Sequence, residues 1–199
     1  MTDSIVLPFP SPIVEARHVR STVLLSSLAA SRAAGHFDQY VEALPLEFHD
    51  AILNTVAGVW LPMTVAVAHY GAFESLGLSP DAQAAMGRET FERSKGTLLG
   101  TAVRLAQNAG VSPWTVLPHF QRFWMRSYDG GGIRVTQIGP KEAHVDVVAF
   151  ELLQFGYYRN ALAGLISGVL GLFSPRVYVK APRTAPRAAR EASFRAQWV

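Results

Sequence analysis

The part of the sequence that most limits the fold is residues 133–180, which have the pattern of two strands, a glycine-rich helix and a third strand. Residues 133–138 and 143–148 alternate apolar and polar side chains around the turn residues 139–141, which is typical of an antiparallel hairpin. Residues 152–173 carry one charge and four glycines, and residues 176–180 have the composition of a short strand. Helical segments precede this unit. We therefore predict an α+β fold, with an N-terminal helical layer packed on a small antiparallel sheet and a Gly-rich C-terminal helix.

Helix starts are marked by two Ser-Pro pairs. Ser79-Pro80 and Ser112-Pro113 each place serine at the N-cap and proline at the first helical position. The first predicts a helix through Asn108 and the second a helix through about Ser127. A further helix is expected from Leu61 or Pro62 to about Leu76. A strand is expected within residues 14–25.

The 199 residues are most simply one domain. Three prolines in residues 1–14 predict an extended leader. Residues 15–181 would form the single α+β domain. Residues 182–199 are rich in alanine and arginine, which predicts a basic tail with a short surface helix over residues 188–198.

Charge is unevenly distributed along the chain. Residues 176–199 hold six bases and one acid, a net charge of +5, whereas the whole chain has +3, so residues 1–175 have −2. The body of the protein therefore lacks the basic surface of a nucleic-acid-binding domain. The chain has no cysteine, which excludes disulfides, thiolate zinc sites and cysteine nucleophiles. This composition fits a cytoplasmic protein.

Residues 51–73 contain no charged side chain and are long enough to cross a bilayer. The run includes Asn54, Pro62 and His69, and no cluster of Lys or Arg flanks it. We therefore expect a buried core helix rather than a transmembrane span. The N-terminus has no positive region before an apolar segment, so no signal peptide is expected.

No catalytic motif is present. The sequence lacks a G-x-S-x-G elbow, a P-loop and a dinucleotide fingerprint, and no two histidines are spaced as metal ligands on one helix. We therefore expect neither an enzyme nor a metal site. Gly164 and Gly168 would let the C-terminal helix approach a neighbour closely.

Aromatic residues recur at helical spacing in three segments, around Trp60, Trp124 and Tyr158. Such residues build a core, and together they also line ligand cavities. Arg159, beside two tyrosines at the start of an apolar helix, is a candidate polar anchor. His69 and His119 lie among aromatic residues, where each could ligate a haem iron or hydrogen-bond at the edge of the core.

Residues 155–168, with the sequence FGYYRNALAGLISG, resemble a pattern shared by haem nitric-oxide-binding domains, 4-vinyl-reductase domains and vesicle-tethering TRAPP subunits. The helical half, with Trp60-Leu-Pro62, Leu76-Gly-Leu78 and Met86-Gly-Arg88, is similar to a myxobacterial paralogous family of roughly 200-residue proteins of unknown function. The resemblance implies a helical layer over a sheet with an internal pocket. The haem-binding members carry Tyr-x-Ser-x-Arg for the haem propionates. Here residues 158–162 match its Tyr alone, so no cofactor is expected although the resemblance points to haem.

The leading hypothesis is a cytoplasmic, non-enzymatic sensory or small-molecule-binding module. It would hold an apolar or amphipathic ligand between helices and sheet, with Trp60, His69, Trp124, Tyr158 and Arg159 in the pocket. One alternative is a scaffold subunit that docks an acidic protein or membrane surface through its basic tail, at Arg183, Arg187, Arg190 and Arg195. The second is a haem gas sensor. A homodimer through the glycine-rich helix is a further hypothesis about partners.

Overall fold

A five-stranded antiparallel sheet organises the molecule, with the strand order β1-β4-β5-β7-β6. The computed structural model describes residues 4–94, 112–182 and 190–199. The strands of this sheet are β1 (Ser4–Leu7), β4 (Gly132–Gly139), β5 (Glu142–Val148), β6 (Val177–Lys180) and β7 (Ala192–Trp198).

The hairpin predicted from the alternating pattern is confirmed as β4 and β5. Val135 pairs with Val145 in the ladder, and the alternation buries Ala143, Val145 and Val147 on one face of β5. The predicted strand after the glycine-rich helix is also confirmed, as β6. The predicted α+β class is therefore confirmed, and the strands that led to the prediction are present in the structure.

The predictions for the two ends of the chain need correction. Residues 192–198 form strand β7, which pairs with β5 on one side and β6 on the other, so the helix predicted over residues 188–198 is wrong. Phe194, Ala196 and Trp198 alternate with exposed residues and face the core. At the other end, residues 4–7 of the expected leader pair with β4. Both segments that we placed outside the domain therefore contribute strands to its sheet.

The N-terminal half is mainly helical, with a two-stranded ribbon of β2 and β3. Its elements are β2 (His18–Arg20), α1 (Ser21–Ala33), α2 (Phe37–Ala43), η1 (Leu46–Phe48), α3 (His49–Leu53), β3 (Trp60–Pro62), α4 (Met63–Ser75) and α5 (Pro80–Ser94). The strand expected within residues 14–25 is only three residues long. Residues 21–25 belong to helix α1, because Val23, Leu24, Ser27 and Leu28 fall on one buried helical face.

The predicted helix starts are confirmed at Pro80 and Pro113, and the helix expected from Leu61 or Pro62 begins at Met63, directly after Pro62. The helix expected to run from residue 80 to residue 108 is described as far as Ser94, and the remainder lies outside the described residues. The helix expected over residues 113–127 is divided into α7 (Pro113–Val116), η2 (Leu117–His119) and α8 (Phe120–Ser127). Pro118 lies at this division, where it cannot donate a backbone hydrogen bond.

The uncharged run of residues 51–73 is not one helix. It contains the end of α3, an exposed turn, β3 and most of α4. Within the described part of the chain, no helix has the length and apolar character needed to cross a membrane.

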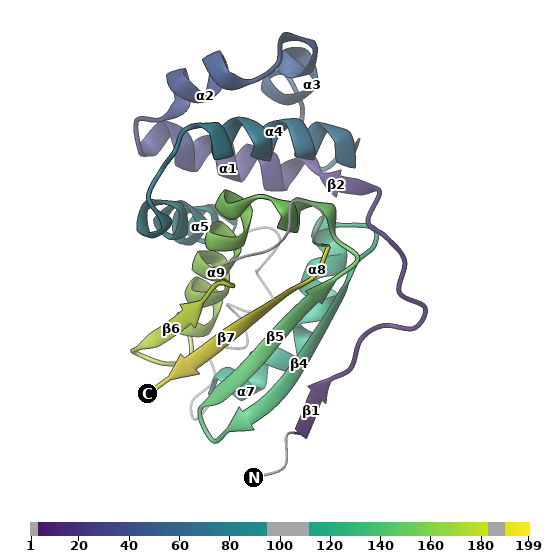
Figure 1. Cartoon of the computed structure of the whole chain (residues 1–199), viewed down its shortest axis with the longest axis vertical. Coiled ribbons are helices and arrows are strands. Elements are labelled where there is room, and N and C mark those ends of the chain that lie inside the picture. The colour runs from purple at the N-terminus through teal and green to yellow at the C-terminus, as the bar shows by residue number, and fades with distance from the viewer. Residues whose placement is uncertain (1–3, 95–111, 183–189) are drawn as a thin grey trace.

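The glycine-rich segment after η3 (Glu151–Gln154) is helix α9 (Gly156–Gly171), which packs tightly on α5. A Cβ atom on Gly164 would lie 2.0 Å from the Ala84 carbonyl oxygen, and one on Gly87 would lie 1.8 Å from the Ala161 carbonyl oxygen. The prediction that Gly164 and Gly168 serve close packing is confirmed, since a Cβ on Gly168 would meet the Phe91 ring at 2.6 Å. Helices α8 and α9 lie against one face of the sheet, and α1 to α4 stack beyond its end (Figure 1).

Candidate functional site

An apolar cavity of about 110 Å³ lies between the helices and the sheet. Its walls include Val23 of α1, Thr90 of α5, Phe123 of α8, Val147 of β5 and Leu165 of α9. None of the described residues that line it carries a charge. Because an unpaired ion is costly to bury, this cavity suits a small neutral guest.

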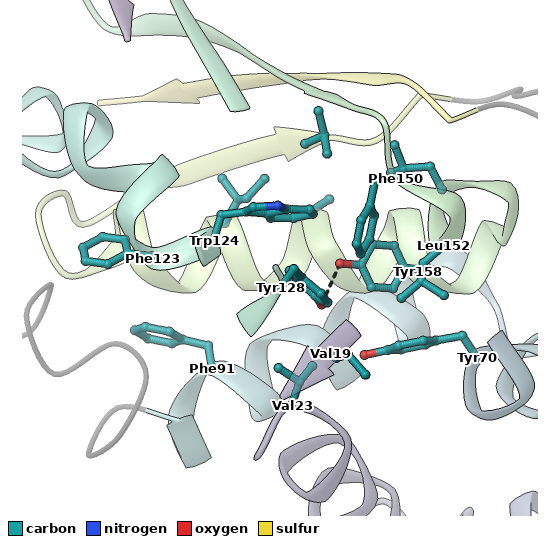
Figure 2. Packing of buried hydrophobic residues seen from close by; sticks show 14 of the residues in the cluster. Val19, Val23, Tyr70, Phe91, Phe123, Trp124, Tyr128, Phe150, Leu152 and Tyr158 are labelled. Carbon is teal, nitrogen blue, oxygen red and sulfur yellow. Dashed lines mark hydrogen bonds between the residues drawn. The ribbon is translucent and has the colours of Figure 1, made fainter. Parts of the chain in front are cut away.

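Aromatic side chains supply much of the lining (Figure 2). Phe120, Phe123 and Trp124 lie three and four residues apart, which places them on one face of α8. The Trp124 ring lies 4.5 Å from the Tyr128 ring between centroids, and its indole N–H donates to the Gly130 carbonyl at 2.7 Å. With its N–H paired away from the cavity, Trp124 presents apolar surface to it.

The described residues that line the cavity include four tyrosines, three serines and one threonine, so its polar groups are hydroxyls. Tyr128 and Tyr158 share a hydrogen bond of 3.0 Å. Burial raises the pKa of both residues, so both stay protonated at neutral pH. Tyr70 also lines the cavity, is 5% exposed and has a raised pKa because it is buried. The hydrogen bonds formed by the described residues include none to the Tyr70 hydroxyl, which leaves a buried donor available to a guest.

Three hydrogen-bonded polar side chains are buried beside the cavity. The Tyr40 hydroxyl lies 2.7 Å from Nδ1 of His69, and Nε2 of His69 lies 3.2 Å from Oγ of Ser27, which lines the cavity. Tyr40 has no other hydrogen-bond partner among the described residues, so we assign its proton to the bond with Nδ1. Nε2 then carries the ring proton and donates it to Ser27.

Ser27, His69 and Tyr40 are arranged in the order of a nucleophile, a base and an orienting group, but the protonation state of His69 does not suit a catalytic base. In this tautomer Nε2 cannot accept a proton from Ser27, as a catalytic base must. Burial also lowers the pKa of His69 to about 3, which makes the imidazole a weak base. These hydrogen bonds between Ser27, His69 and Tyr40 therefore have a structural role: they link helices α1, α4 and α2.

Arg159 does not line the cavity. Its guanidinium donates to the backbone carbonyls of Leu153 and Gln154 at 2.6 and 3.1 Å, while its Nε has no partner. Burial lowers the pKa of Arg159, and the carboxylate of Glu74 opposes that effect. Glu74 also accepts hydrogen bonds from the backbone N–H groups of Gly156 and Tyr157, at 3.1 and 2.6 Å. Arg159 and Glu74 together anchor the start of α9 to α4.

Of the five predicted pocket residues, only Trp124 and Tyr158 line the cavity. Trp60 is 39% exposed on β3, with the Arg20 guanidinium 4.0 Å from its ring centroid. Tyr70 and Tyr128, which the prediction left out, do line the cavity. Both stand at helical spacing among other aromatics, but that signal alone does not separate cavity walls from solid core.

Comparison with known proteins identifies the fold. No family model matches the sequence, and no curated protein matches it significantly. Solved H-NOX domains do match the structure. The Fe(II) unliganded A71G mutant of the H-NOX protein from K. algicida has a TM-score of 0.66 and 9% identity, with 90% of this chain and 96% of that chain covered.

Two further matches agree. An oxygen-binding H-NOX domain related to soluble guanylate cyclases has a TM-score of 0.59 and 12% identity, covering 90% of this chain and 94% of its own. The I5F mutant of T. tengcongensis H-NOX has a TM-score of 0.61 and 12% identity, covering 90% and 97%. At these identities the likeness shows the fold alone. It confirms the distant resemblance to haem nitric-oxide-binding domains as a resemblance of fold, and membership of the myxobacterial family stays a prediction.

The donor groups that the described residues bring to the cavity do not fit a haem iron. All six histidines are described, and none lines the cavity. Both ring nitrogens of His69 already have hydrogen-bond partners, and the hydroxyls of Tyr128 and Tyr158 are hydrogen-bonded to each other. Where the haem signature has Ser and Arg, this chain has Asn160, which donates to Gln83 at 2.7 Å, and Leu162, which lines the cavity.

Proposed function

We propose that this chain is a non-enzymatic sensory or small-molecule-binding module, which holds an apolar or amphipathic molecule in the cavity between its helices and its sheet. The observation that carries the proposal is an aromatic-lined cavity that contacts both layers and whose described lining residues include no charged side chain. A guest there would touch α1, α5, α8, α9 and the sheet at once. Occupancy would therefore bias how the two layers pack, which is what a partner protein could detect. A cytoplasmic location remains part of the proposal.

A methyl NMR titration tests this function. Toluene should shift the methyl signals of Val23, Val147 and Leu165, which line the cavity from three different elements. Leu165→Trp should fill the cavity and abolish these shifts while the protein still melts cooperatively. Met125→Trp is the matched control, because Met125 is 61% exposed on α8 and should leave binding intact. Absence of a shift in the wild-type protein would show that the cavity takes no guest.

The haem-sensor alternative has less support, because the donor groups described above do not fit haem iron. We predict that haemin mixed with the purified protein keeps the absorption spectrum of free haemin. A sharp, shifted Soret band at one haem per chain would contradict this. If such a band appeared, its loss in His69→Ala would assign the ligand, with His36→Ala as a control outside the core.

The scaffold alternative has less support, because two of the four arginines proposed to dock a partner already form ion pairs within the protein. Arg190 forms an ion pair with Glu15, and Arg195 forms one with Glu142, so both are engaged within the chain. Arg183 and Arg187 lie outside the described residues. Their joint replacement by alanine tests docking to an acidic surface without touching β7. The size of the wild-type particle in light scattering tests the predicted homodimer in the same samples.

A further inference from the structure

The volume of the cavity limits the size of its guest. At about 110 Å³ it is somewhat smaller than the engineered cavity of roughly 150 Å³ that binds benzene or xenon in another protein. Pockets for drug-sized ligands are several times larger, roughly 300–1,000 Å³. Modest side-chain adjustment would admit one aromatic ring, and a multi-ring ligand would require the helices to separate from the sheet.

The lining favours a flat, neutral molecule. Phe123, Trp124 and Tyr158 offer ring faces and edges, which attract another aromatic ring at offset or edge-to-face geometry. No charged side chain among the described lining residues would offset the burial of a carboxylate or ammonium group. Anionic and cationic ring compounds should therefore be rejected.

Tyr70 adds one polar requirement. Its ring is fixed edge-to-face against Tyr158, with centroids 4.8 Å apart. In Figure 2 the hydroxyls of Tyr70, Tyr128 and Tyr158 all point toward the space between the helices. Tyr128 and Tyr158 share one hydrogen bond, which uses the proton of only one of the two hydroxyls, whereas Tyr70 is 95% buried and its hydroxyl has no hydrogen-bond partner at all among the described residues. A buried hydroxyl of this kind gains most from a guest that hydrogen-bonds to it.

We infer that the cavity recognises neutral, single-ring aromatic molecules that carry one hydroxyl group, the phenol class, and that the Tyr70 hydroxyl pairs with the hydroxyl of the guest. This inference rests on the proposed function and adds the ligand class to it. Tyr70 thus determines specificity, while the aromatic and aliphatic walls supply most of the attraction.

The test compares three probes of similar size by NMR titration of the full chain: benzene, phenol and benzoate. Benzene and phenol should bind, and benzoate should not. In Tyr70→Phe the affinity for phenol should fall by roughly tenfold or more, because one hydrogen bond is lost, while the affinity for benzene changes by less than about twofold. Tyr178→Phe removes the hydroxyl of a tyrosine on β6 that is 63% exposed, and should change neither affinity.

A second measurement does not depend on how the variant folds. In the wild-type protein the carbon-13 signal of the Tyr70 Cζ atom should shift when phenol is added and should shift much less with benzene. Equal phenol affinity in wild type and Tyr70→Phe, or equal Cζ shifts with the two probes, would overturn the inference and leave the binding function standing. Failure of all three probes to bind would instead remove the proposed function itself. Tight binding of benzoate would overturn the neutral-ligand requirement.

Discussion

His69 is a residue whose protonation the fold controls strongly. It is fully buried, lies between a tyrosine and a serine hydroxyl, and packs edge-to-face against Tyr70 and Phe73. Protonation would place a charge in this cluster and require the Tyr40 hydroxyl to accept a hydrogen bond from Nδ1 where it now donates one. The pKa of about 3 is the direct result of that burial.

We predict that the protein loses stability as pH falls from about 6.5 toward 3. In that window an unfolded histidine binds a proton and the folded His69 does not, so protons favour unfolding by up to roughly 1.4 kcal/mol per pH unit. Denaturant unfolding at pH 7, 6 and 5 measures this slope. His69→Asn cannot titrate and should show a shallower slope than the wild-type protein. Parallel slopes in the two proteins would show that His69 is not the group responsible.

At the level of elements, the contact between α5 and α9 depends on glycines that face backbone rather than side chains. Gly164 and Gly87 each lie opposite a carbonyl oxygen of the other helix, so neither clash can be relieved by a rotamer change. The two helices must move apart to admit even a methyl group. Because α5 and α9 both line the cavity, such a shift would also change its shape.

Gly164→Ala should therefore destabilise the protein by about 1–3 kcal/mol or more. Gly171→Ala is the matched control on the same helix. Its added Cβ meets nothing within 4 Å, and alanine favours a helix over glycine, so this variant should be as stable as wild type or more stable. Thermal unfolding followed by circular dichroism compares them. Similar melting temperatures for the two variants would contradict the close contact.

Prediction from sequence succeeded for elements whose local signal agrees with their environment. The β4–β5 hairpin alternates with period two, and Pro80 and Pro113 follow good N-caps, so local preference and final structure coincide. Residues 192–198 were missed because their alanine and arginine content favours a helix, whereas pairing with two neighbouring strands decides the outcome. The cavity was only partly foreseen, since its described walls come from α1, α4, α5, α8, α9 and the β4–β5 hairpin, most of which are distant from one another in sequence.

For the whole molecule, β7 determines whether the sheet is continuous. It lies between β5 and β6, and Phe194 is fully buried beneath it. Phe194→Ala should destabilise the protein by about 3–5 kcal/mol, since a large cavity would open in the centre of the core. Arg195→Ala, at the adjacent outward-facing position, should leave the melting temperature almost unchanged. If both variants melted like the wild type, residues 192–198 would not be a core strand.

The order of the strands also has a consequence for the rate at which the sheet forms. Within the described sheet, β4 and β5 are the nearest in sequence, with Gly139 opposite Glu142, whereas β1 pairs with β4 across most of the chain, with Ser4 opposite Gln137. Local hairpins close in microseconds, and pairings between distant segments must first overcome the entropy of closing a long loop. Folding should therefore begin at the β4–β5 hairpin and proceed outward, with the attachment of β1 among its slow steps.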